Sequence, residues 1–195
     1  MPRVGVLALQ GDVREHTAML ERVGATVVAV RTVEHLDGLD ALVMPGGEST
    51  TIAHLLTTSG IRPVLEKELA NGLSVLGTCA GLILLSAEIL DGRRDQWSFD
   101  ALPVAVRRNG YGRQISSFET TLNVRGIGEV PGVFIRAPKI ESWDEDLEVL
   151  ATHDHGDGAH PVLVRRGRVW GCSFHPELTN DERVHRLFVD SLQLG

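Results

Sequence analysis

Cys79 has the sequence surroundings of a catalytic nucleophile. It lies between Gly77 and Gly81, near the end of an apolar run that begins at Leu73 and before a second apolar run, 82–85. A buried strand that turns sharply into a helix lifts the residue at the turn clear of the sheet, and small flanking residues permit that strained backbone. We therefore interpret Cys79 as a nucleophile on a strand-to-helix elbow.

A histidine and a glutamate near the other end of the chain could complete the chemistry. A strand pattern stops at Pro176, which His175 and Glu177 flank. In an extended backbone, residues two apart point to the same side, so the Glu177 carboxylate could hold one ring nitrogen of His175 and leave the other for a thiol. If both segments end at the carboxyl edge of one sheet, Cys79, His175 and Glu177 form a nucleophile, a base and an orienting acid. The imidazolium and the helix that begins at Ala80 would then both favour the thiolate.

A third segment, 44–50, reads Met-Pro-Gly-Gly-Glu-Ser-Thr and follows a strand pattern. Its glycines leave backbone N–H groups open to a ligand. Acyl transfer through a thioester passes through a tetrahedral oxyanion, which needs such donors. We expect the N–H groups of Gly47 and Ala80 to form the oxyanion hole.

Each signal also has a non-catalytic interpretation. A buried cysteine can simply fill the core, and we assign that role to Cys172, which shares a strand face with Trp170 and Phe174. The His-Pro-Glu segment could be a surface turn, and the Pro-Gly-Gly segment could only end a strand. Their coincidence at strand ends favours acyl transfer by cysteine, because together they supply every role that the reaction requires.

Two other motifs do not predict a site. The histidine-rich segment 153–160 lies in a glycine-rich connection without a rigid element to fix tetrahedral geometry, so we interpret it as a solvated loop and expect no metal. The glycines at 126, 128 and 132 are wrongly spaced for a dinucleotide-binding fingerprint and meet Pro131 where a helix would begin, so they predict a turn. No cofactor is expected.

Length and composition favour one domain, residues 1–195, with a substantial core, since 43% of the residues are hydrophobic. The net charge of −7 and scattered arginine pairs give no basic face, so we expect no nucleic-acid partner.

The apolar stretch 4–9 is shorter than the core of a signal peptide, about 7–15 residues. No segment approaches the about 18 apolar residues of a membrane span. With only two cysteines, we expect a cytoplasmic protein that does not act at a membrane.

The pattern along the chain predicts an α/β fold: a three-layer sandwich with a central, mostly parallel but mixed sheet and helices on both faces. Asp12 is expected to cap the first helix in a capping box with Glu15, and Gly24 to end it. The prolines of the middle segment, 104–169, indicate hairpins. The predicted strands are 4–9, 26–30, 41–44, 74–76, 118–124 and 162–164, and the last helix is 181–192.

The motifs Gly77-Thr78-Cys79-Ala80-Gly81 and Phe174-His175-Pro176-Glu177 resemble those of the class I, triad-type glutamine amidotransferases, which have a flavodoxin-like fold. Narrower motifs resemble one branch of that class, the glutaminase subunits of pyridoxal 5'-phosphate synthase. These are Leu7-Ala8-Leu9-Gln10-Gly11, 45–51, Arg108-Asn109, Gly112-Arg113-Gln114, Ser117-Phe118-Glu119 and 134–138. The resemblance extends from about Val4 to Val189.

The resemblance implies that the chain hydrolyses L-glutamine to glutamate and ammonia, and that a separate synthase subunit uses the ammonia to make pyridoxal phosphate. Cys79, His175 and Glu177 match the family's triad. The matching glutamine-binding positions are Gly47, Glu48, Ser49, Arg108, Ile135 and Arg136. Glu48 and one of the arginines would be natural counter-charges for the ammonium and carboxylate of glutamine, and which arginine binds the carboxylate stays open.

The family also implies that docking on the synthase subunit completes the oxyanion hole, with segment 10–16 and the Pro-Gly-Gly loop near the interface. The chain departs from the family mainly at 93–100 and 153–160, away from the triad. Two alternatives stay open. A cysteine peptidase or deglycase-like hydrolase would share the fold, and a catalytically silent module could cap or regulate the synthase.

Overall fold

The computed structural model describes residues 1–110 and 117–193 of the chain. Its centre is a seven-stranded sheet in the order β10-β11-β12-β4-β3-β1-β2. Its strands are β1 (Arg3–Leu7), β2 (Thr26–Val30), β3 (Ala41–Met44), β4 (Ser74–Thr78), β10 (Glu148–Asp154), β11 (Ala159–Arg166) and β12 (Val169–Cys172). The five strands from β12 to β2 are parallel to one another. β11 pairs antiparallel with both of its neighbours, β12 and β10. The predicted mixed, mostly parallel sheet is therefore confirmed.

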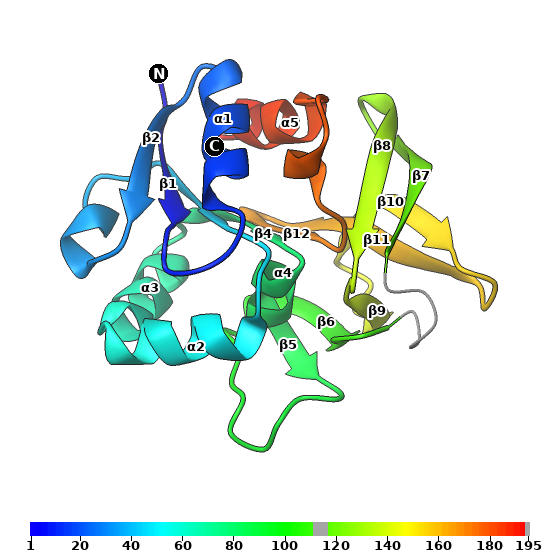
Figure 1. The fold of residues 1–195 in the computed structure, drawn as a ribbon, viewed down its shortest axis with the longest axis horizontal. Helices are drawn as coiled ribbons and strands as arrows, with labels where there is room; N and C mark the ends of the chain where they lie inside the picture. The colour runs from blue at the N-terminus through cyan, green and yellow to red at the C-terminus, as the bar shows by residue number, and fades with distance from the viewer. Residues whose placement is uncertain (111–116, 194–195) are drawn as a thin grey trace.

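Helices cover both faces of this sheet (Figure 1). One face carries α1 (Val13–Arg22) and α5 (Arg183–Ser191), and the other carries α2 (Ser49–Thr58), α3 (Ile61–Ala70) and α4 (Ala80–Leu85). Two short 3-10 helices, η1 (Val33–Leu36) and η2 (Pro176–Leu178), lie in connections. Two separate apolar clusters fill the space between the sheet and its covering layers. This is the three-layer arrangement that the alternating pattern predicts.

Two smaller sheets extend the layers. β7 (Ser117–Val124) and β8 (Gly128–Ile135) form an antiparallel hairpin on the α5 side, and their apolar side chains join the cluster that contains Phe188. β5 (Ser86–Ile89), β6 (Leu102–Arg107) and β9 (Lys139–Trp143) form a three-stranded sheet whose apolar side chains join the α2–α3 cluster. The hairpins expected from the prolines of the middle segment are therefore present.

The register of the parallel strands determines what meets at their carboxyl edge. Thr78 of β4 pairs with Cys172 of β12, and Gly77 pairs with Met44 of β3. The residues that follow β3, β4 and β12 thus emerge side by side, as they do in other open α/β sheets. No helix within the described residues is long and apolar enough to cross a bilayer.

Several predicted details were wrong. Asp12 occupies the N-cap position of α1, but its side chain makes no capping hydrogen bond, so the capping box with Glu15 does not form. The histidine-rich segment is a solvated loop only at its tip, where residues 156–158 are exposed, because β10 and β11 include its two ends. His153 and His155 have ring centroids 4.2 Å apart and pack against the Phe118 ring. Aromatic burial, which spacing alone does not reveal, orders this hairpin.

Candidate active site

Cys79 lies on the strained turn between β4 and α4, with φ 47° and ψ −102°. A positive φ is unusual for any residue with a side chain and is held only where the surroundings enforce it. The flanking glycines allow the close packing: a Cβ on Gly77 would lie 2.5 Å from the carbonyl carbon of Gly81, and a Cβ on Gly81 2.1 Å from the carbonyl oxygen of Met44. The sequence-predicted elbow is thus present in the structure.

Backbone hydrogen bonds bring the histidine segment to the elbow. The Cys79 N–H donates to the carbonyl oxygen of Cys172 at 2.8 Å, which extends the pairing of β4 with β12 by one residue. Three residues beyond Cys172, the N–H of His175 donates to the carbonyl oxygen of Val133 on β8, also at 2.8 Å. The triad segment is therefore fixed on both sides, by the central sheet and by the hairpin.

His175 and Glu177 form a buried pair, each only 4% exposed. Nδ1 of His175 lies 2.7 Å from Oε1 of Glu177. The expectation that an extended backbone aligns them was wrong, because the chain enters the 3-10 helix η2 at Pro176, and the tight turn brings the carboxylate back to the ring. The predicted contact is therefore present, but a turn of 3-10 helix, not an extended backbone, brings the two side chains together.

The surroundings of His175 favour its protonated form. Burial alone would lower the pKa of His175, but hydrogen bonding to Asp12, Cys79 and Glu177 raises this pKa to about 12. Oδ2 of Asp12 lies 3.4 Å from Nδ1 of the ring. Glu177 and Asp12 thus both face one ring nitrogen, which leaves the other for the Cys79 thiol.

A cavity of about 270 Å³ opens in front of this pair. A volume of this size suits a small molecule rather than a folded chain. Of the predicted site residues, it is lined by Gly47, Glu48, Ser49, Cys79, Arg108, Ile135, Arg136 and His175. Glu177 lies behind His175, and Ala80 is fully buried at the first turn of α4. The structure therefore brings together the residues that sequence reasoning selected from five separate segments.

Two oppositely charged residues face each other in this cavity. Nη2 of Arg108 lies 2.8 Å from Oε1 of Glu48, and the Arg108 backbone N–H donates to Asp91 at 2.7 Å. Within the described part of the chain, the buried Nε of Arg108 has no hydrogen-bond partner. Arg108 thus lines the cavity with its guanidinium beside Glu48.

Sequence reasoning missed several residues that line the same cavity, namely Gln10, Asp12, Ile83, Asn109 and Leu178. The Oε1 of Gln10 accepts a hydrogen bond of 2.9 Å from the N–H of Glu48 and so fixes the loop after β3. Both Gln10 and Asp12 follow β1, a parallel strand that ends at the same edge. That position is a signal from which they could have been found.

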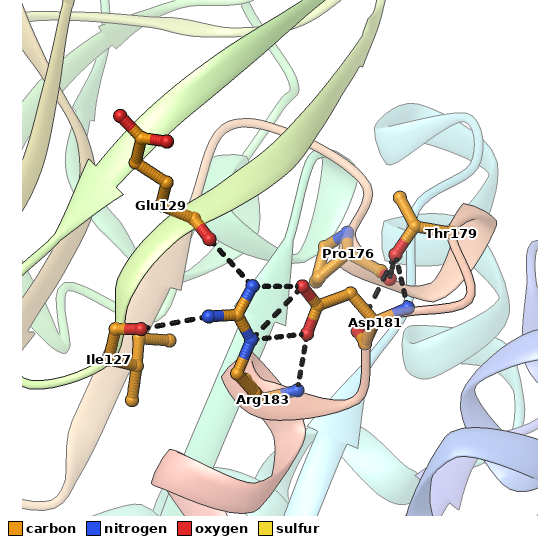
Figure 2. Close-up of polar contacts among 6 residues, drawn as sticks. All are labelled: Ile127, Glu129, Pro176, Thr179, Asp181 and Arg183. Atoms are coloured by element: carbon orange, nitrogen blue, oxygen red, sulfur yellow. Dashed lines mark hydrogen bonds and ion pairs between the residues drawn. The ribbon is translucent and has the colours of Figure 1, made fainter.

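A clamp around Arg183 holds the chain that follows the triad pair (Figure 2). The guanidinium donates to the carbonyl oxygens of Ile127 at 2.9 Å and Glu129 at 2.6 Å, where β7 turns into β8. Its Nε lies 2.9 Å from Oδ1 of Asp181. The hydroxyl of Thr179 donates back to the carbonyl oxygen of the triad-segment proline at 3.0 Å. α5 and the hairpin are thereby tied to the segment that carries His175.

One cluster among the described residues could hold a metal ion. It consists of Asp12, His175 and Glu177, whose ligand atoms lie within 4.8 Å of one another. Because the His175 nitrogen in this cluster already contacts Glu177, we interpret the group as an acid–base pair and not as a metal site. Of the family motifs, Gly112-Arg113-Gln114 lies outside the described residues.

The fold and the geometry together define a class of protein. A cysteine on a strand-to-helix elbow, beside a histidine–glutamate pair at the carboxyl edge of a mostly parallel sheet, is the arrangement of an α/β enzyme that transfers or hydrolyses acyl groups through cysteine.

Comparison with known proteins narrows this class. The SNO glutamine amidotransferase family matches residues 6–194. The chain is 52% identical over 194 residues to pyridoxal 5'-phosphate synthase subunit PdxT of Kineococcus radiotolerans, covering 97% of this chain and 94% of that protein. It is 50% identical over 195 residues to the subunit of the same name in Mycobacteroides abscessus, covering 100% of this chain and 99% of that protein. The chain belongs to the SNO glutamine amidotransferase family.

Solved structures agree with this assignment. A crystal structure described as glutamine amidotransferase has a TM-score of 0.90 and 50% identity, over 97% of this chain and 98% of that one. The structure of PurLQS from Thermotoga maritima has a TM-score of 0.68 at 15% identity, over 98% of this chain and 99% of that one. This more distant likeness shows a shared fold.

Proposed function

We propose that this chain is the glutaminase subunit of a pyridoxal 5'-phosphate synthase. It hydrolyses L-glutamine to L-glutamate and ammonia and supplies the ammonia to a synthase subunit for vitamin B6 biosynthesis. The observation that carries the proposal is the position of Cys79 and His175 on one small cavity, with Glu177 2.7 Å behind the histidine. The subunit name of the full-length relatives supports the assignment of the pathway.

In the proposed reaction, His175 takes the proton of the Cys79 thiol, and the sulfur attacks the side-chain amide carbon of glutamine. His175 then gives this proton to the departing ammonia, which leaves a glutamyl thioester on Cys79. Water, deprotonated by His175, hydrolyses the thioester to release glutamate. The raised pKa of His175 supports the first step, because it favours transfer of the thiol proton to the ring.

The charged ends of glutamine would bind at the mouth of the cavity. Glu48 is the proposed partner of the ammonium, and Arg108 is the arginine we favour for the carboxylate, because its guanidinium lies beside Glu48 in the cavity. Arg136 also lines the cavity and, with Ser49 and Ile135, completes the proposed substrate site. The same ion-pair chemistry selects free amino acids over peptide amides, which lack both charges.

The proposed oxyanion hole consists of the N–H groups of Gly47 and Ala80. Ala80 follows the nucleophile and begins α4, and Gly47 lies in the loop that Gln10 holds through the N–H of Glu48. Because this loop borders the cavity and contacts the segment after β1, a docked synthase subunit would move it into its active position. We propose that the segment after β1 and this loop lie near the interface.

We place this activity in the cytoplasm. Cys79 and Cys172 are both free thiols in the structure, and a thiol nucleophile persists in a reducing compartment. Cys172 is completely buried and belongs to the same core cluster as Trp170 and Phe174, in agreement with a packing role.

The test is an ammonia-release assay with L-glutamine, using wild type, Cys79→Ala and Cys172→Ala, each with and without the synthase subunit. We expect ammonia from the wild type and from Cys172→Ala in the complex, and none above background from Cys79→Ala. Equal release by wild type and Cys79→Ala would refute the mechanism. Turnover of peptide amides instead of free glutamine would indicate a peptidase, and no release by any complex would indicate a silent binding module.

A further inference from the structure

A buried histidine network lies directly behind the His175–Glu177 pair. His16 on α1 is completely buried, and its Nδ1 lies 2.9 Å from Nε2 of His185 on α5. Nε2 of His16 lies 3.0 Å from Oγ1 of Thr78, the residue before the nucleophile. The same Nε2 lies 3.4 Å from Oε2 of Glu177. The network therefore connects two helices and β4 to the carboxylate.

The two carboxylate oxygens of Glu177 have different surroundings. Oε1 contacts His175, whereas Oε2 is buried and, among the described residues, has no hydrogen bond within ordinary distance. Burial raises the pKa of Glu177, against the hydrogen bond from His175. A buried carboxylate oxygen needs a donor to stay ionised, and Nε2 of His16 is the ring nitrogen that faces it.

The network is consistent with one arrangement of protons. A carboxylate only accepts hydrogen bonds, so the ring nitrogen facing Glu177, Nε2 of His16, should carry the hydrogen. That N–H then donates to Oγ1 of Thr78 and lies beside Oε2 of Glu177 as an electrostatic contact at 3.4 Å, and Nδ1 of His16 accepts from Nε2–H of His185. A neutral imidazole carries one ring hydrogen, so Nδ1 of His185, which has no partner among the described residues, then carries none.

Both histidines are held in the neutral form. Burial lowers the pKa of His16 well below its usual value, and His185 and His175 lower it further. Burial likewise lowers the pKa of His185 to about 4. His16 thus offers Glu177 a directed N–H without a second positive charge that would compete with His175 for the carboxylate.

From this geometry we propose that His16 is a positioning residue for the proposed glutaminase reaction: its Nε2–H faces Oε2 of Glu177, turns Oε1 toward His175 and so aligns the base with Cys79. The inference rests on the proposed function. His16 does not line the cavity, so it acts on the reaction through the residues that it contacts, and Glu177 is the one of these that belongs to the triad.

Two amide substitutions separate this role from a merely structural one. The amide nitrogen of glutamine can take the place of Nε2 as a donor, and the amide oxygen of asparagine can take the place of Nδ1 as an acceptor. His16→Gln therefore keeps the donor toward Glu177, whereas His16→Asn keeps the contact with His185. We expect His16→Asn to lower kcat in the synthase complex about 10- to 100-fold, with KM for glutamine changed by less than about twofold. We expect His16→Gln to stay within about threefold of the wild-type kcat.

Phe188→Leu on α5 is the control for stability. It weakens the apolar cluster on the α1–α5 side of the sheet without touching Glu177. It should lower the melting temperature at least as much as His16→Asn and leave kcat within about twofold of wild type. Equal kcat values for the two His16 variants, or a lower kcat for His16→Gln than for His16→Asn, would overturn the proposal.

The protonation state of His16 can also be measured in the wild-type protein. Nitrogen NMR of ¹⁵N-histidine-labelled protein at neutral pH should show His16 neutral with its hydrogen on Nε2. A hydrogen on Nδ1, or a charged ring, would overturn the proposal. Failure of the proposed function would appear differently, as equal ammonia release by wild type and Cys79→Ala, so the two failures can be told apart.

Discussion

Nη2 of Arg108 and Oε1 of Glu48 lie 2.8 Å apart in the catalytic cavity, so the two residues proposed to bind the ends of glutamine neutralise each other. A substrate that carries both charges can insert between them and replace one ion pair with two. A ligand with a single charge would leave one partner unpaired, which is unfavourable in a half-buried site. This relationship explains how a small, polar cavity can prefer a zwitterion.

Glu48→Gln should therefore weaken glutamine binding more than it slows the chemistry. The variant keeps the shape and the backbone contact with Gln10 but removes the charge that faces the substrate ammonium. We expect KM to rise about 10-fold, because Glu48 is half exposed and solvent screens part of the interaction. Steady-state kinetics of the complex measure this change.

The matched control for that variant is Glu66→Gln on α3. Glu66 forms an ion pair of the same length, 2.8 Å, with Arg62, and neither residue lines the catalytic cavity. The KM of Glu66→Gln for glutamine should equal that of wild type. If Glu48→Gln and Glu66→Gln give the same KM, Glu48 does not bind the ammonium.

The Arg183 clamp should contribute more to stability than an ordinary surface ion pair. Arg183→Leu removes the bonds to two carbonyl oxygens of the β7–β8 turn as well as the contact with Asp181 (Figure 2). We expect the melting temperature to fall by about 2–4 °C. Arg183→Lys should recover little of this loss, because one ammonium cannot reproduce the planar fork.

Arg186→Leu is the control on the same helix. Arg186 pairs with Glu182 one turn away at 2.8 Å, an exposed contact that should matter little. Thermal unfolding of the three variants checks the prediction. A larger loss for Arg186→Leu than for Arg183→Leu would show that the bonds to the turn are unimportant.

Much of this architecture follows from patterns in the sequence. Short β-branched runs predicted the parallel strands, and the glycines around Cys79 predicted the elbow, because both are local signals. Contacts between segments were harder to predict. Asp12 looked like a helix cap, yet its carboxylate faces His175, and nothing near residue 12 in the sequence indicates that a histidine more than a hundred positions later will lie there.

The same reason explains the missed histidines. His16 and His185 each occur in an amphipathic helix, where a single histidine predicts little. Only the packing of α1 against α5 brings Nδ1 of His16 to 2.9 Å from Nε2 of His185 and places His16 beside Glu177. The His175–Glu177 contact was predicted from spacing, but the backbone geometry assumed for it was wrong, since the proline begins a 3-10 turn.

Buried neutral histidines should make the protein less stable in acid. Burial lowers the pKa of His185 to about 4, whereas an unfolded histidine titrates near its usual 6.5. Between these two pH values the unfolded state binds more protons than the folded state. The free energy of unfolding therefore falls as the pH falls through this window, by on the order of 1 kcal/mol per pH unit.

His185→Leu isolates this effect, because the variant lacks the titrating group while the other ionisable groups remain. Denaturant titrations of both proteins at pH 7, 6 and 5 should show a steeper loss of stability for wild type than for the variant. Parallel pH profiles would mean that the pKa of His185 is the same in the folded and unfolded states.

The central claim is that Cys79 carries the glutamyl group during turnover, and acid-quenched mass spectrometry tests it most directly. The complex with the synthase subunit is mixed with L-glutamine, quenched within the first turnovers and digested. The account predicts a glutamyl adduct on the peptide that contains Cys79, absent from Cys79→Ala and present in Cys172→Ala. Ammonia release by wild type with no adduct at Cys79, or with an adduct elsewhere, would contradict it.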